Sequence, residues 1–342
     1  MNSMRPQRGD ETMRLTLRFD MRQPGNDPQL AGNYAAMVDM CVWADSLRFE
    51  EVFVGEHHGA EDSYIPAPIV LLSAVAARTH FIKIHVSALL VPMYEPLRLA
   101  EDLAVLDIIS NGRLRMTAGM GYRPHEFAMF GVDYKTRLKT FLENIEVLQK
   151  AWSGEPFEFR GTTVRVLPRP VQRPGPKIIL GGSTEKAAQR AARLGFDFMP
   201  GFPPHYEFYR EALRALGKPE PPALPNQAPN FLYVTEDPER DWPRVAPAVL
   251  HGTNTYAKWA TERGVGSTMY KNLESIEELK GNPIFQVVTP EQCVSFAKSL
   301  EPHGELQFQP LFGGLDPSIA WKSLHLFERK VIPALRREGL RD

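Results

Sequence analysis

The sequence predicts a (β/α)₈ TIM barrel with a long insertion after its seventh strand. Short apolar runs alternate with longer helical ones over about 320 residues, which is typical of a parallel α/β sheet. Four polar or glycine-containing segments follow predicted strands, and a barrel gathers such segments at one mouth. They are Glu56-His57-His58, Ser87-Ala88, Gly119-Met120-Gly121 and Gly181-Gly182-Ser183. A doubly wound open sheet is the alternative fold.

The composition limits the class of protein. The chain has 342 residues, 43% of them hydrophobic, so it can bury a large core, and its formal net charge is −1. This charge balance does not favour a nucleic acid or an anionic membrane as a partner. Cys41 and Cys293 are too few and too far apart for a disulfide framework or a zinc pair. Without a long apolar run, the sequence predicts a cytoplasmic protein, with a loose leader at 1–12 and one domain at 13–335.

The first half of the chain supplies four predicted strands and four predicted helices. The third helix is clearest, because Leu99, Leu103 and Leu106 recur at helical spacing before Asn111-Gly112 ends it. The predicted strands cover residues 14–19, 51–54, 81–91 and 113–118, and the predicted helices cover 33–47, 66–78, 96–109 and 135–152.

The second half continues the alternation with longer connections. A hairpin-like excursion at 157–173 precedes the fifth strand, and a proline-rich surface linker at 217–229 precedes the seventh. Residues 237–288 are too long for an ordinary barrel connection, so we expect a lid there. The predicted strands cover 177–180, 196–199, 231–235 and 306–309. One predicted helix follows Thr184 and ends at Leu194, and the others cover 204–216, 245–260, 290–300 and 317–329.

Glu56-His57-His58 is the main candidate for chemistry. An imidazole exchanges a proton near neutral pH, so general acid/base catalysis is one interpretation. Metal binding is the other, but it would need ligands from further strands, and no other strand end supplies His or Cys. We therefore predict no metal. His57 is the predicted catalytic residue, and His58 is predicted to be a hydrogen-bonded structural residue.

Gly181, Gly182, Ser183 and Thr184 are candidates for phosphate binding. Glycines let a ligand approach the backbone, and the first turn of the following helix presents amide groups of positive character. The alternative is a tight strand-to-helix turn in which Ser183 is an ordinary N-cap.

Gly119-Met120-Gly121 is not a dinucleotide fingerprint, because Pro124 stands where G-x-G-x-x-G needs its third glycine. The two glycines instead admit a flat ring or a phosphate close to the backbone. Tyr122 and Arg123 either contact that group or pack the loop.

Several motifs together resemble the bacterial luciferase-like flavin-dependent monooxygenases. They lie at 55–58, 86–92, 101–113, 119–127, 168–174 and 181–183. The resemblance implies a TIM barrel, often a homodimer, that binds reduced FMN at the carboxyl ends of its strands. The flavin ring would lie by Ser87-Ala88, where the family commonly has a non-prolyl cis peptide, and near the Gly119–Tyr122 loop. Gly181, Gly182, Ser183 and Thr184 would hold the phosphate, with Met120 in place of the luciferases' phosphate-binding arginine.

The resemblance also implies a reaction. Reduced FMN from a separate flavin reductase would react with O2 to give a C4a-(hydro)peroxyflavin, which oxidises a small organic substrate, with His57 managing a proton nearby. The alternatives are a deazaflavin-dependent oxidoreductase on the same barrel and a flavin-binding protein without turnover.

Overall fold

Parallel strands and intervening helices make up most of the protein. The computed structural model describes residues 13–25, 30–224, 226–227, 230–262, 271–300 and 304–341. The strands are β1 (Arg14–Phe19), β2 (Glu51–Val54), β3 (Lys83–Leu90), β4 (Leu114–Gly119), β5 (Phe157–Phe159), β6 (Thr162–Val164), β7 (Lys177–Gly182), β8 (Asp197–Pro200), β9 (Asn226–Gln227), β10 (Phe231–Val234), β11 (Phe285–Val288) and β12 (Gly304–Phe308). The α-helices are α1 (Leu30–Ser46), α2 (Pro68–Arg78), α3 (Pro96–Ile109), α4 (Pro124–Met129), α5 (Arg137–Ser153), α6 (Glu185–Leu194), α7 (His205–Ala215), α8 (Pro238–Glu262), α9 (Ile276–Lys280), α10 (Pro290–Ser299), α11 (Pro317–Leu326) and α12 (Ile332–Arg337).

The main sheet has eight strands in the order β8-β7-β4-β3-β2-β1-β12-β9, and all its ladders are parallel. β1 joins the first strands to β12 near the end of the chain, as a barrel requires. Within the described ranges, however, no ladder connects β8 to β10 or β11. The predicted parallel α/β sheet is therefore confirmed, but it is curled and not closed by backbone pairing.

The predicted insertion at 237–288 contains regular structure. Its last residues form β11, which pairs in parallel with β10 in a separate two-stranded sheet. Together with β10, the segment therefore forms a strand–helix–strand unit, with α8 and α9 between the strands, and it is not a loop insertion. Phe285 and Val287 of β11 are buried, so this strand is part of the core. It was not predicted from the sequence because an irregular stretch precedes it. Residues 263–270 of the segment, like the expected leader at 1–12, lie outside the described residues.

Three further predictions need correction. The expected loop after the fourth strand contains α4, which begins at Pro124, a residue suited to a first helical turn. The expected linker at 217–229 contains β9. The final helix does not end at Arg329, because a π-helical turn at Phe327–Val331 continues it into α12.

The helix α3 illustrates how local sequence forms these elements. The side chain of Glu95 caps its first turn by accepting hydrogen bonds from the backbone N–H groups of Leu97 (2.9 Å) and Arg98 (3.1 Å). Leu99 and Leu103 are fully buried on the inner face. Each such leucine contributes about 1.5–3 kcal/mol through burial, so the inner face stabilises the helix on the sheet.

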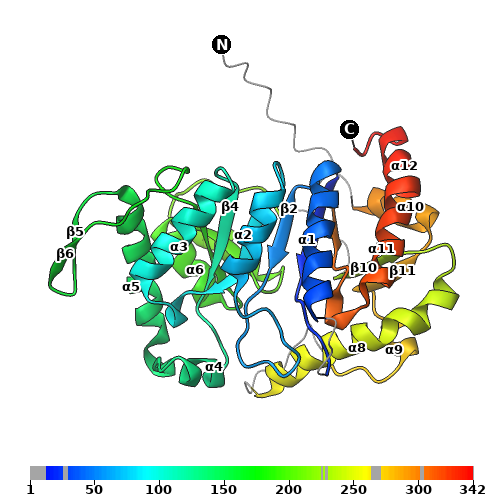
Figure 1. The fold of residues 1–342 in the computed structure, drawn as a ribbon, viewed down its shortest axis with the longest axis horizontal. Helices are drawn as coiled ribbons and strands as arrows, with labels where there is room; N and C mark the ends of the chain where they lie inside the picture. Colours follow the sequence, from blue (N-terminus) through cyan, green and yellow to red (C-terminus); the bar gives the residue numbers. More distant parts are fainter. Residues whose placement is uncertain are drawn as a thin grey trace, which may run out of the picture.

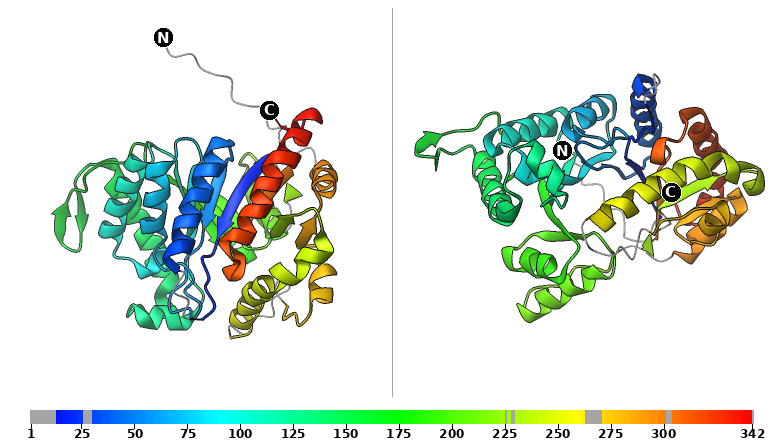
Figure 2. Two further views of the ribbon diagram at one scale, coloured as in Figure 1. Left: turned by 45° about the vertical axis from the view of Figure 1, so that its right-hand side comes forward. Right: turned by 90° about the horizontal axis from the view of Figure 1, so that it is seen from below.

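The carboxyl ends of the strands lie at the lower end of the molecule in Figure 1, where the loops after β1 and β2 meet α4 and α8. Seen from that end, in the right panel of Figure 2, the helices follow one another around the strands in chain order, from blue through green and yellow to red. No helix in the described part of the chain is long and apolar enough to cross a membrane.

Candidate active site

His57 is held at the end of β2 by a carboxylate from α4. Its Nδ1 lies 2.8 Å from Oε1 of Glu126, and the two residues are 69 positions apart in the chain. Both are buried, with His57 8% exposed and Glu126 not exposed. Since a carboxylate accepts hydrogen bonds, Nδ1 of His57 carries the proton and Nε2 is left as the basic nitrogen.

The charges around this pair keep His57 neutral. Burial lowers the pKa of His57, and the positive charges of Arg22 and Arg123 act in the same direction, against the opposite effect of Glu126. Burial alone would raise the pKa of Glu126, but its hydrogen bonds to His57 and to the backbone N–H of His58, and the charge of Arg123, outweigh this effect and lower it. The arrangement is a neutral imidazole oriented by a carboxylate.

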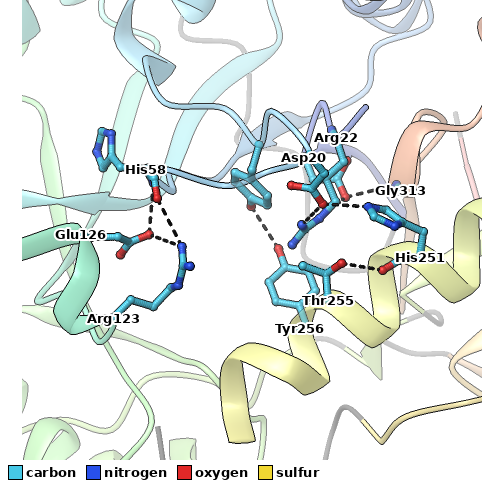
Figure 3. Close-up of polar contacts among 11 residues, drawn as sticks. Asp20, Arg22, His58, Arg123, Glu126, His251, Thr255, Tyr256 and Gly313 are labelled. Carbon is cyan, nitrogen blue, oxygen red and sulfur yellow. Dashed lines mark hydrogen bonds and ion pairs between the residues drawn. The ribbon is translucent and has the colours of Figure 1, made fainter. Parts of the chain in front are cut away.

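Glu126 also organises the surrounding loop. Its Oε1 accepts hydrogen bonds from the backbone N–H of His58 (3.1 Å) and from Nη1 of Arg123 (3.1 Å), as Figure 3 shows. Arg123, which was expected to contact a ligand or to pack the loop, donates to the carbonyl of His58 and lies over the ring of Trp259. It is therefore part of the histidine cluster.

His58 is buried and hydrogen-bonded within the loop, and its structural role stays a prediction. Its Nε2 lies 3.0 Å from Oε1 of Glu56, which is also hydrogen-bonded to the hydroxyl of Tyr94. The second oxygen of Glu56 accepts the backbone N–H of Leu90 at 2.6 Å. Glu56 thus joins the end of β2 to the end of β3.

Aromatic rings enclose His57. The rings of Tyr64 and Trp259 lie 4.9 and 4.6 Å from the imidazole, and that of Tyr122 lies at 5.6 Å. Trp259 and Tyr256 come from α8, so this helix covers the histidine. The hydroxyl of Tyr256 donates to that of Tyr64 at 3.1 Å. The enclosure makes the site apolar apart from a few placed polar groups, as in ligand pockets.

A buried ionic cluster attaches α8 to the loops after β1 and β2. Asp62 accepts hydrogen bonds from Nη1 of Arg22 and, at 2.8 Å, from Nε2 of His251 on α8. Burial opposes ionisation of Asp62, but His251 and Arg22 outweigh it and lower the pKa of Asp62 to about 2. Asp20 lies beside Arg22 in the same cluster (Figure 3), and burial raises its pKa. His251 is thus engaged with Asp62.

The predicted cofactor residues lie on adjacent strands. The Ser87–Ala88 peptide bond is cis, as the resemblance implied, and the register between β3 and β4 shifts beside it. An added Cβ at Gly119 would lie 2.8 Å from the Cβ of Ala88, so this glycine allows β4 to approach that bulge. Ser87 and Ala88 are partly exposed, whereas Leu89 and Leu90 are buried. They therefore leave an accessible surface at the mouth.

The phosphate candidates lie at the start of α6. The N-cap is Thr184, whose hydroxyl accepts the backbone N–H of Ala187, so the expectation that Ser183 caps the helix was one residue off. Ser183 is exposed. Added Cβ atoms at Gly181 and Gly182 would lie 2.8 Å from Thr117 and 2.4 Å from Ala187, so close packing within the protein already requires both glycines.

These features fit a flat, phosphorylated cofactor. The first turn of α6 offers amide groups beside the Ser183 and Thr184 hydroxyls, which suits a phosphate. The accessible Ser87–Ala88 surface beside Gly119 has no large side chain, which suits a ring. In the ranges described, no three His, Cys, Asp or Glu side chains are placed to hold a metal ion.

Three important residues were not singled out from sequence. Glu126 follows Pro124 at a helix start, and Asp20 and Arg22 directly follow β1. Charged residues just after a barrel strand are candidates for a functional site, so the position of Asp20 and Arg22 after β1 could have identified them.

Comparison with known proteins identifies the family of this chain. Residues 15–301 match the model of the luciferase-like monooxygenase family. The oxygenase component of the flavin-dependent trigonelline monooxygenase of Acinetobacter baylyi is 26% identical, over 82% of this chain and 80% of its own. The match to protein y4vJ of Sinorhizobium fredii, 28% identical, spans 46% of either chain. This chain thus spans about half the length of that relative.

Solved structures show the same fold. The oxygenating constituent of the 3,6-diketocamphane monooxygenase of Pseudomonas putida, solved with FMN, superimposes with a TM-score of 0.72. The two are 21% identical, and the match covers 94% of this chain and 98% of that one. From the family match over 15–301, the chain belongs to the luciferase-like monooxygenases.

Proposed function

We propose that this protein is the oxygenase of a two-component system that uses reduced FMN and O2 to oxidise a small organic substrate. A separate flavin reductase would supply the reduced FMN. The observation that carries the proposal is the neutral, buried His57, oriented by Glu126 at the same end of the sheet as the Ser87–Ala88 surface and the α6 N-terminus. When bound, FMN would supply the activation of oxygen.

The protein's own residues would orient the reactants and control protons. Nε2 of His57 would accept or return a proton, because Glu126 keeps the other nitrogen protonated. The rings of Tyr64 and Trp259 would exclude water from that nitrogen. Ser183 and the first turn of α6 would hold the phosphate.

Stopped-flow absorbance tests the proposal. The protein is mixed with FMN, a flavin reductase and NADH, and an oxygen-dependent transient of the bound reduced flavin is expected. His57→Ala should leave FMN affinity near normal and lower product formation by about 100-fold or more. His80→Ala is the control, since the His80 side chain is 80% exposed, and it should behave like wild type. Clear FMN binding without any transient would refute the monooxygenase assignment and favour a flavin-binding protein without turnover.

The phosphate assignment is tested separately. Ser183→Asp places a negative charge beside the α6 N-terminus and should abolish FMN binding measured by calorimetry, whereas Ser183→Ala should weaken it only slightly. Equal affinities for the two variants would show that the phosphate binds elsewhere.

A deazaflavin is the alternative cofactor. The F420-dependent glucose-6-phosphate dehydrogenase of Amycolatopsis mediterranei is 27% identical over 60% of this chain. Parallel titrations with FMN and F420 distinguish the two. Tighter binding of F420, with no oxygen-dependent transient, would replace the monooxygenase by a hydride-transferring oxidoreductase.

We also propose that the protein is a homodimer in which α2 and α3 meet a second copy. These helices are neighbours (Figure 1), and their outer face exposes Val70 (72%), Val105 (44%) and Ile108 (41%). Such a patch suggests an interface. On α3, Arg98 pairs with Asp102 one turn away, so antiparallel packing of two copies would place each residue opposite its complement.

Light scattering after gel filtration measures this association. Wild type should have the mass of a dimer, and Val70→Asp should shift the mass toward that of a monomer. Leu216→Asp, at a 46% exposed position at the end of α7, is the control and should remain dimeric. A monomeric wild type would contradict the proposal.

A further inference from the structure

Arg22 has a hydrogen-bonding edge that the protein leaves unused. Its side chain is fully buried in the loop after β1. Nη1 donates to Asp62, but within the described parts of the chain Nε and Nη2 have no hydrogen-bond partner. Buried donors are nearly always paired, so two unpaired N–H groups on one side chain require an explanation.

The two unpaired groups belong to the same side of the guanidinium. The Nε–H and Nη2–H bonds point in parallel along one edge of the plane, and this edge matches the two oxygens of a carboxylate. Asp20 does not occupy it: its Oδ2 lies 3.3 Å from Nε, which is an ion-pair distance without hydrogen-bond geometry. Burial raises the pKa of Asp20, so its carboxylate competes less well for the guanidinium of Arg22 than the carboxylate of a stronger acid would.

The surroundings of this edge suit a planar ligand. The guanidinium carbon of Arg22 lies 4.8, 4.6 and 4.5 Å from the ring centres of Tyr64, Tyr256 and Trp259. The rings of Tyr64 and Trp259 also lie against His57, at 4.9 and 4.6 Å. A molecule whose anionic end meets Arg22 would therefore place its body among aromatic walls next to the proposed catalytic histidine.

We propose that Arg22 is a specificity-determining residue and that the substrate is a planar carboxylate, bound through Nε and Nη2 with its ring between the aromatic side chains. Tyr256 and Trp259 pack against the guanidinium from α8, so the ligand would enter when α8 moves outward. The identification of this site as the substrate site rests on the proposed function, whereas the anion site itself does not.

The competing explanation is a closed cation–π cluster that binds no ligand. Aromatic faces attract a guanidinium and accept N–H groups weakly, so the three rings would then compensate the unpaired donors. The two explanations differ in one measurable property, which is whether the protein prefers a carboxylate to a neutral molecule of the same shape.

Benzoate and benzamide are suitable probes, because they share a ring and differ in charge. Each is titrated into the protein while tryptophan fluorescence is recorded, since Trp259 packs against the Arg22 guanidinium. We expect benzoate to bind at least about tenfold more tightly than benzamide. Equal affinities, or binding of neither probe, would overturn the proposal, and this comparison uses wild type only.

Two variants locate the site. Arg22→Lys retains the charge but loses the planar edge, so benzoate affinity should fall about tenfold while benzamide affinity stays unchanged. Arg123→Lys changes the other guanidinium on Trp259, at 4.2 Å, and should preserve the preference for benzoate. Loss of the preference in Arg123→Lys alone would assign the anion site to Arg123 and refute the role of Arg22.

Failure of this proposal can be distinguished from failure of the proposed function. Benzoate binding without an oxygen-dependent flavin transient would retain the anion site and remove the monooxygenase. An oxygen-dependent flavin transient without any preference for benzoate would retain the monooxygenase and remove the anion site.

Discussion

Asp62→Asn tests whether the ionic cluster beneath α8 stabilises the protein. In wild type, the Asp62 carboxylate accepts hydrogen bonds from Arg22 and His251, which come from the β1 loop and from α8. The substitution keeps the size of the side chain and removes its charge. Arg22 remains fully buried, with a weaker partner.

The expected magnitude follows from the pKa of Asp62, which lies at about 2 in the folded protein. An unfolded aspartate titrates near 4, and each unit corresponds to about 1.4 kcal/mol, so the charged form of Asp62 contributes about 2–3 kcal/mol. Because the folded pKa is the lower one, this contribution is complete above about pH 4. It is lost as the pH falls from about 4 toward 2.

Urea unfolding followed by circular dichroism at several pH values measures the effect. At pH 7, Asp62→Asn should lower the free energy of unfolding by about 2–3 kcal/mol. The difference from wild type should shrink as the pH falls below about 4. Asp39→Asn is the control, because Asp39 and its partner Arg78 are both 56% exposed, and it should change the free energy by less than about 0.5 kcal/mol.

Two outcomes would refute this reasoning. A difference at pH 7 no larger than that of Asp39→Asn would show that the cluster contributes little beyond its desolvation cost. A difference that stays constant down to pH 3 would show that the charge of Asp62 is not its cause.

Two further substitutions probe the histidine and the strand ends. Glu126→Gln removes the charge that raises the pKa of His57, so the acid limb of the pH profile of kcat/KM should move to lower pH. The value of kcat should fall about 10- to 100-fold. An acid limb that does not move would exclude His57 as the titrating base. Gly119→Ala places a Cβ 2.8 Å from that of Ala88 and should cost about 1–3 kcal/mol of unfolding free energy. Gly32→Ala should cost nothing, because among the described residues an added Cβ would meet no heavy atom within 4 Å outside its own helix backbone, and equal losses would contradict the packing argument.

Much of the fold follows from local pattern. Buried parallel strands are continuous apolar runs, and helices such as α3 repeat leucines at three and four residues, so both types are visible in one sequence. Closure of the barrel is not visible in this way, because it depends on a ladder between β8 and later strands. The short strand β11 was missed for a similar reason, since only its pairing with β10 distinguishes it from a loop.

The same distinction applies to the site, where local motifs were predictable and contacts between distant residues were not. His57 was predicted from a local motif at a strand end, and the structure places it in a buried cluster. Its partner Glu126 lies 69 residues further along the chain, and no periodicity links positions that far apart. Arg22 is one of many arginines in the sequence. Only the folded chain reveals that its side chain is buried with an unused edge.

The separate pairing of β10 with β11 has a consequence for how this protein can change. The backbone bonds of these strands are internal to the unit that carries α8, and none of the described ladders ties them to the eight-stranded sheet. Substitutions in α8 can therefore reshape the wall opposite His57 while the strand ends that carry Ser87 and Gly181 keep their register. The framework for a cofactor and the wall that selects a substrate can thus diverge independently, so one ancestral sheet could serve many substrates.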